Sequence, residues 1–160
     1  MKSAIITYTD LQEMQVPWHD ARCVLVGGCF DVLHYGHIVF LQKAKEQGDV
    51  LVIALESDVF IKSSKKRTPI HSQKERAFIL SALRCVDYVI LLPLLSEDSA
   101  YAIFVQQVSP SVIAVTEGDP ALEKKRTHAA QVGATICVVT PLLSTFSTTN
   151  ILNYENSHRD

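Results

Sequence analysis

At 160 residues the chain has the length of one ordinary domain, with enough material for one sizeable core. Hydrophobic residues make up 48% of the sequence, charged residues 20%, and the formal net charge is only −2, so the chain lacks the basic excess of a general nucleic-acid binder. The longest apolar run, 88–95, is interrupted by Pro93 and is too short to cross a bilayer, and the N-terminus lacks a signal-peptide pattern. We therefore expect a cytoplasmic protein with neither a nucleic-acid nor a membrane partner.

The first half of the chain predicts a βαβ unit. Residues 23–26 form a short β-branched run that ends at a Gly-Gly pair, as a buried strand would. Helical spacing begins at Gly36, with Gly48 in the place of a C-terminal cap, and 50–55 is again a continuous apolar run. Parallel strands joined in this way require a right-handed crossover.

The alternation of strands and helices continues along the chain. Residues 57–71 are expected to form a polar loop, and Ser72 and Glu75 have the spacing of a capping box at the start of a helix. The later predicted elements are a strand over 86–92, a helix over 97–107, a strand over 111–115, a helix over 120–132 closed by Gly133, a strand over 135–139 and a short helix from 147 or 148.

This order predicts an α/β fold with a Rossmann-like, doubly wound sheet of about five parallel strands. We assign residues 1–22 to an N-terminal extension, 23–154 to a single domain and 155–160 to a flexible tail. Four cysteines stand singly in apolar stretches, without a Cys-x-x-Cys pair, and we expect reduced core thiols.

The segment after the first predicted strand carries the strongest functional signal, because sheets of this kind bind ligands at the carboxyl ends of their strands. It reads GCFDVLHYGH over residues 28–37. His34 and His37 flank Gly36 where the first helix begins, so free N–H groups, the helix dipole and two imidazoles would meet a phosphate there. Donors of this kind stabilise charge on a transferring phosphate. The alternatives are two incidental surface histidines, or a zinc site that lacks obvious further ligands.

The pattern Gly-x-Phe-Asp-x-x-His-x-Gly-His resembles the signature of the cytidylyltransferase-like family of nucleotidyltransferases, and the resemblance runs from about residue 25 to 152. It implies a HUP-type fold and direct attack by a substrate phosphate on the α-phosphate of ATP or CTP, without a covalent enzyme intermediate. It also implies Mg²⁺, held mainly by the nucleotide phosphates rather than by a protein metal site, and makes a homodimer a candidate assembly.

The resemblance extends the set of candidate site residues beyond the two histidines. The hydroxyls of residues 147–149 suit the β- and γ-phosphates, with ordinary N-capping as the alternative. A lysine of the basic loop contacts phosphate in the family, although such a loop is also commonly just solvated. Asp119 could bind ribose hydroxyls or cap a helix, and Asp31 could orient a polar substrate or a loop. Arg84 matches an arginine that lies near the substrate phosphate in the family, whereas Arg76 suits a structural ion pair.

The candidates fall into three groups. Catalytic candidates are His34, His37, Lys65 and Lys66; nucleotide-binding candidates are Gly28, Cys29, Phe30, Gly36, Glu117, Gly118, Asp119, Ser147, Thr148 and Thr149; substrate-binding candidates are Asp31 and Arg84. The chain departs from some relatives in having no arginine over residues 141–146.

Three acceptor classes fit this pattern. The run 147–151 and the segment before the first strand look like the adenylyltransferase domain that acts on heptose 1-phosphate, whereas 84–87 is similar to glycerol-3-phosphate cytidylyltransferases. Flavin adenylyltransferases of the archaeal type share the same signature. We favour a sugar-phosphate adenylyltransferase. A regulatory module that has lost catalysis would show a broken His-x-Gly-His or a lost hydroxyl triplet, and both are intact. A flavodoxin-like electron carrier would need a hydroxyl-rich phosphate loop after the first strand, where this sequence has paired histidines.

Overall fold

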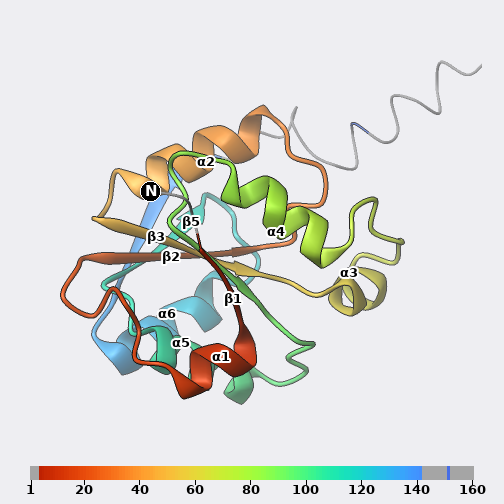
Figure 1. The fold of residues 1–160 in the computed structure, drawn as a ribbon. Coiled ribbons are helices and arrows are strands. Elements are labelled where there is room, and N and C mark those ends of the chain that lie inside the picture. Colours follow the sequence, from red (N-terminus) through yellow and green to blue (C-terminus); the bar gives the residue numbers. More distant parts are fainter. Residues whose placement is uncertain (1–3, 142–150, 152–160) are drawn as a thin grey trace, which may run out of the picture.

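The computed structural model describes residues 4–141 and residue 151 (Figure 1). Its elements are β1 (Ala4–Thr7), α1 (Tyr8–Glu13), β2 (Cys23–Gly28), α2 (Tyr35–Lys45), β3 (Val50–Leu55), α3 (Asp58–Ser64), α4 (Gln73–Ser81), β4 (Tyr88–Leu91), α5 (Asp98–Val108), β5 (Val112–Thr116), α6 (Leu122–Val132) and β6 (Thr135–Thr140). Within these residues, no helix is both long and apolar enough to cross a membrane.

The strands form one parallel sheet in the order β1-β4-β3-β2-β5-β6. From β2 the chain winds outward through β3 and β4, then returns to the other side of β2 for β5 and β6. The strand order therefore reverses between β2 and β5, and a crevice opens at their carboxyl ends. The predicted doubly wound, Rossmann-like sheet is confirmed.

The sheet has six strands, one more than the sequence indicated. The additional strand is β1, which pairs in parallel with β4 along the edge, with Ile6 beside Ile90. Thr7 and Asp10 then form a capping box that starts α1. Within the expected N-terminal extension, residues 4–7 thus add a strand to the sheet and residues 8–13 form α1. A four-residue edge strand with one buried side chain leaves little pattern to find.

Helices cover both faces of the sheet, with α2 and α4 on one side and α1, α5 and α6 on the other (Figure 1). Along β2 the side chains alternate between two hydrophobic clusters, Val24 and Val26 in one and Cys23 and Leu25 in the other. Burial on both faces explains why the central strands read as continuous apolar runs.

Two expectations about local structure were wrong. Gly48 does not cap α2, which ends at Lys45 with Glu46 in a right-handed conformation. A Cβ at Gly48 would instead lie 2.4 Å from the Arg22 carbonyl oxygen, so glycine is needed for close approach. The expected polar loop 57–71 contains α3, because the Ser57 hydroxyl accepts a hydrogen bond from the Phe60 N–H at 3.1 Å and caps a helix there.

Other local predictions were confirmed. Ser72 and Glu75 form the expected capping box of α4, and Gly133 ends α6 in the left-handed conformation with φ of 71°. All four cysteines are free, but only Cys23 is fully buried and the others are half-buried, so the expectation of four core thiols was too broad.

Candidate functional site

A cavity of about 970 Å³ opens at the carboxyl ends of the central strands, on both sides of β2. Several predicted residues line it together, namely Gly28, Cys29, Phe30, His37, Lys65, Gly118 and Asp119. The structure therefore brings the end of β2, the start of α2, the end of α3 and the turn after β5 to one place. Its volume suits a small-molecule ligand of substantial size.

The two motif histidines lie at the beginning of α2. His34 is the N-cap residue and His37 lies in the first turn, so the side chains meet on one face of the helix. Their rings stack with centroids 3.8 Å apart, and the Phe30 ring lies 5.1 Å from that of His37. Burial lowers the pKa of His34, and burial together with the neighbouring His34 lowers the pKa of His37 to about 4. Both imidazoles are therefore neutral near pH 7, when each offers one N–H donor.

Glycines allow the tight turn that leads to this helix. A Cβ on Gly28 would lie 2.8 Å from the Phe30 ring, and Phe30 itself adopts a positive φ of 46°. Gly36 lies in the first turn of α2 but does not line the cavity.

Asp31 is directed toward the loop before α4. Its buried carboxylate forms an ion pair with Arg67 and accepts hydrogen bonds from the N–H groups of Ile70 and His71 at 2.9 and 3.1 Å. Burial alone would raise the pKa of Asp31, but these donors outweigh it and hold the pKa below its usual value. Of the two roles that the sequence left open for Asp31, the structure shows the positioning of a loop.

Arg76 fixes the neighbouring backbone. Its guanidinium is fully buried and donates to the carbonyls of Cys29, Glu56 and His71, while forming an ion pair with Asp58 at 2.7 Å. The Arg76 side chain thereby joins the carboxyl ends of β2 and β3 to the start of α4. The expected structural role of Arg76 is confirmed.

The structure distinguishes the two lysine candidates. Lys65 ends α3 and lines the cavity, and its charge partly offsets the effect of burial, which raises the pKa of Cys29. Lys66 has a positive φ of 55° and does not line the cavity. Arg67, the next residue along the chain, is anchored by its ion pair with Asp31.

The turn after β5 carries the second predicted nucleotide-binding element. Gly118 has a positive φ of 73° and Asp119 lies beside it on the cavity wall. The Asp119 carboxylate accepts a hydrogen bond from the Ala121 N–H at 2.8 Å and forms an ion pair with Lys125 at 2.7 Å. Asp119 is not the expected helix cap, because α6 begins at Leu122 and its N-cap residue is Ala121, without a side-chain cap hydrogen bond. Glu117 is exposed and its N–H donates to the Thr140 carbonyl at 2.9 Å.

The structure does not bring Arg84 to this cavity, and it does not describe the hydroxyl triplet. Arg84 is exposed between α4 and β4, at the amino edge of the sheet, whereas the cavity lies at the carboxyl edge. Ser147, Thr148 and Thr149 lie outside the described residues.

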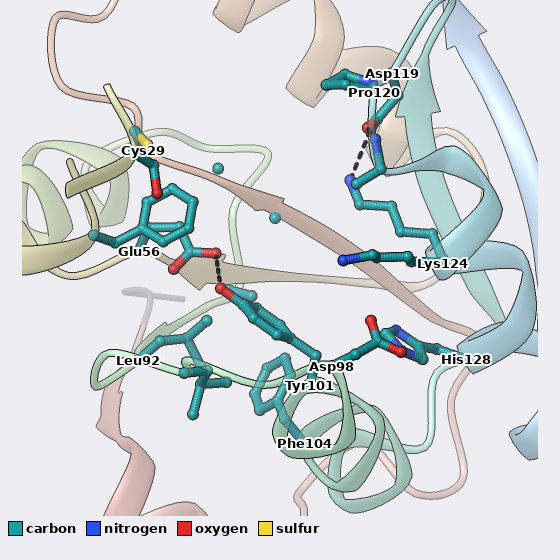
Figure 2. Close-up of a pocket in the computed structure, with 18 of the residues that line it drawn as sticks. Cys29, Glu56, Leu92, Asp98, Tyr101, Phe104, Asp119, Pro120, Lys124 and His128 are labelled. Atoms are coloured by element: carbon teal, nitrogen blue, oxygen red, sulfur yellow. Dashed lines mark hydrogen bonds and ion pairs between the residues drawn. The ribbon is translucent and has the colours of Figure 1, made fainter. Parts of the chain in front are cut away.

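Several cavity residues were missed by sequence reasoning. Glu56 directly follows β3, and its Oε1 accepts a hydrogen bond of 2.9 Å from the Tyr101 hydroxyl on α5 (Figure 2). Burial raises the pKa of Glu56, and burial and the neighbouring carboxylate raise that of Tyr101. His128 on α6 lies 3.2 Å from the Asp98 carboxylate (Figure 2). The position of Glu56 at a strand end could be read from the sequence, but its hydrogen-bond partner comes from a helix 45 positions along the chain.

Among the described residues, no group of three His, Cys, Asp or Glu side chains is arranged to hold a metal ion. The zinc alternative for the histidine pair thus gains no further ligands from residues 4–141.

A parallel doubly wound sheet with paired imidazoles, a helix N-terminus and a glycine turn at its switch point defines a protein that binds nucleotide phosphates. Residues 25–151 match a family profile described as Cytidylyltransferase-like. The chain belongs to this family of nucleotidyltransferases.

Curated relatives support the assignment. The chain is 45% identical over 96 residues to "Bifunctional protein HldE" of Helicobacter pylori (strain HPAG1), which covers 59% of this chain and 20% of that protein. It is 37% identical over 118 residues to the protein of the same name from Wolinella succinogenes, covering 72% of this chain and 24% of the relative. The chain thus spans about a fifth to a quarter of the length of these relatives.

Solved structures agree on the fold. The lipopolysaccharide core biosynthesis protein from Thermoplasma volcanium GSS1 is 26% identical, with a TM-score of 0.62 over 75% of this chain and 95% of its own. A pantoate-beta-alanine ligase from Francisella tularensis is 14% identical with a TM-score of 0.64 over 98% of this chain and 77% of that chain, a likeness that concerns the fold alone.

Proposed function

We propose that this chain transfers AMP from ATP to a sugar 1-phosphate of the heptose type and releases pyrophosphate. The observation that carries the proposal is the intact His34-x-Gly36-His37 element at the N-terminus of α2, in which His37 lines the cavity and His34 stacks on it. Similarity to proteins named "Bifunctional protein HldE" supports the proposal. Their name indicates two activities, and the match is confined to about a fifth of their length. One of those activities would reside in a domain of this kind.

The chemistry requires charge stabilisation rather than proton removal. An oxygen of the acceptor phosphate attacks the α-phosphorus of ATP, the new P–O bond forms, and the bond to the bridging oxygen of the β-phosphate breaks as pyrophosphate leaves. The attacking oxygen is already anionic, so no general base is needed. Neutral His34 and His37 suit this step, because they can donate hydrogen bonds to phosphate oxygens without themselves changing protonation.

Further residues would bind the two substrates. We assign Lys65 to the phosphates, because it is the loop lysine on the cavity wall, and assign Gly118 and Asp119 to the nucleoside side of the site. The hydroxyls of Ser147 to Thr149 are proposed to bind the β- and γ-phosphates. Mg²⁺ would be held mainly by the nucleotide phosphates, whose charge it would neutralise, in keeping with a cavity whose Asp98 and Asp119 carboxylates already have basic partners.

The test is a pyrophosphate-release assay with Mg²⁺, with ATP and CTP offered in turn against heptose 1-phosphate, glycerol 3-phosphate and flavin mononucleotide. We expect release with ATP and heptose 1-phosphate. Release with CTP and glycerol 3-phosphate, or with ATP and flavin mononucleotide, would replace the proposed substrate pair. Nucleotide binding without release from any pair would favour a non-catalytic regulatory module.

A further inference from the structure

The cavity extends well beyond the histidines, to the side of β2 occupied by β3 and β4. Glu56 follows β3, Leu92 follows β4, and Tyr101 projects from α5 into the same region (Figure 2). The turn with Gly118 and Asp119 follows β5, on the opposite side of β2. A nucleotide bound at the β5 side and the central histidines would therefore leave the β3 and β4 side for the second substrate.

Glu56 is an unusual residue for this position. It is 8% exposed, yet its carboxyl has one hydrogen-bond partner, the Tyr101 hydroxyl on Oε1. Its Oε2 is buried and has no hydrogen-bond partner within residues 4–141 and 151. Buried carboxylate oxygens are nearly always paired, so an unpaired one on a cavity wall has acceptor capacity that a ligand can fill. A rotation about the broad terminal torsion of Glu56 would turn the oxygen toward the cavity.

The surrounding charges restrict which ligand group can fill that capacity. A phosphate beside Glu56 would be repelled, so the phosphates belong near His37 and Lys65. An ammonium group would meet the positive charges of Lys125 and the buried Arg76, which already act on Glu56. Neutral hydroxyls are compatible with both charges, because they donate to a carboxylate and accept from an ammonium.

From these contacts we propose that Glu56, oriented by Tyr101, is a specificity-determining residue that accepts hydrogen bonds from the sugar hydroxyls of the acceptor. This inference rests on the proposed function for the identity of the acceptor. Leu92 and Phe104 supply apolar wall beside Glu56 and Tyr101, which suits the C–H surface of a sugar ring (Figure 2). Glu56 thus acts on acceptor binding and not on nucleotide binding.

The test measures initial rates of pyrophosphate release over a matrix of ATP and heptose 1-phosphate concentrations for wild type, Glu56→Ala, Glu56→Gln and Tyr101→Phe. We expect Glu56→Ala to raise the acceptor KM by about tenfold or more, since a hydrogen bond to a charged group is lost, and to leave the ATP KM within about twofold. Glu56→Gln and Tyr101→Phe should produce smaller shifts in the same direction. The matched control is Glu123→Ala, an exposed glutamate on α6, which should leave both KM values unchanged.

Two results would overturn the inference. An unchanged acceptor KM in Glu56→Ala would show that Glu56 does not contribute to acceptor binding. A rise confined to the ATP KM would show that Glu56 contacts the nucleotide instead. Melting temperatures of the variants exclude general unfolding as the cause of a shift.

The inference can fail separately from the proposed function. If wild type releases no pyrophosphate with any substrate pair, calorimetric titration with heptose 1-phosphate alone tests whether Glu56 binds the sugar phosphate. Binding that Glu56→Ala weakens by about tenfold would uphold the role of Glu56 although the proposed reaction is wrong. Equal binding by both proteins, or no binding by wild type, would overturn the role of Glu56.

Discussion

Replacement of Arg76 by methionine tests how the edge of the cavity is held together. Arg76 is fully buried and its guanidinium joins three backbone carbonyls and the Asp58 carboxylate. Methionine keeps much of the side-chain length but donates no hydrogen bond. The carbonyls of Cys29 and Glu56 and the partly exposed Asp58 would lose their basic partner.

The expected loss is about 3–5 kcal/mol in the free energy of unfolding, the range for removing one partner of a buried, hydrogen-bonded ion pair. Each unpaired carbonyl adds a desolvation cost of about 1–3 kcal/mol, although water entering the space would recover part of it. Arg76→Lys should fall between wild type and methionine, because an ammonium group cannot span the same set of acceptors as a planar guanidinium. A loss of this size is a large fraction of the stability of an ordinary domain.

Urea denaturation followed by circular dichroism measures the effect. Arg126→Met is the matched control, since Arg126 is exposed on α6 and its ion pair with Glu123 spans 3.5 Å, so we expect a change below about 0.5 kcal/mol. A loss below about 1 kcal/mol in Arg76→Met would refute the view that this side chain holds the strand ends together.

Three further predictions concern the site. Folding lowers the pKa of His37 from 6.5 to about 4, so the unfolded chain binds more protons than the folded chain between these pH values. The free energy of unfolding should therefore rise with pH across this window, by about 1–2 kcal/mol after solvent screening is allowed for. Urea melts at a series of pH values should show this rise in wild type and a flatter curve in His37→Gln. Lys65→Ala should lower kcat by about tenfold or more while Lys66→Ala stays near wild type, because only Lys65 lines the cavity; equal effects in steady-state assays would contradict this assignment. Asp31→Asn should release Arg67 and speed tryptic cleavage at residues 65–67, and an unchanged cleavage rate would mean that Asp31 does not anchor the loop.

The sequence was informative wherever local chemistry and spacing decide the structure. Apolar runs located the strands over 23–26 and 50–55, and the Ser72 and Glu75 spacing located a helix start, because these signals act within a few residues. The first βα turn could be placed at the switch point for the same reason. Edge strand β1 and short helix α3 escaped prediction because each has few buried residues of its own.

The candidate site was predictable in part, because it combines local motifs with contacts between distant segments. His34 and His37 come from one helical turn, so their proximity follows from spacing. The hydrogen bond between Glu56 and Tyr101 spans 45 positions, and it depends on how α5 packs against the sheet. The family resemblance also placed Arg84 among the substrate-binding candidates, whereas its position before β4 puts it at the amino edge of the sheet.

The most direct test of the central claim follows the phosphates of ATP into the products. Protein, Mg²⁺ and heptose 1-phosphate are incubated with ATP labelled at the α- or the γ-phosphate, for wild type and for His34→Ala and His37→Ala. We predict that the α-label enters the sugar product, that the γ-label leaves as pyrophosphate, and that each histidine variant lowers turnover by about a hundredfold or more with an unchanged fold. Transfer of the γ-label to the sugar, or near-normal turnover in both histidine variants, would contradict nucleotidyl transfer at this site.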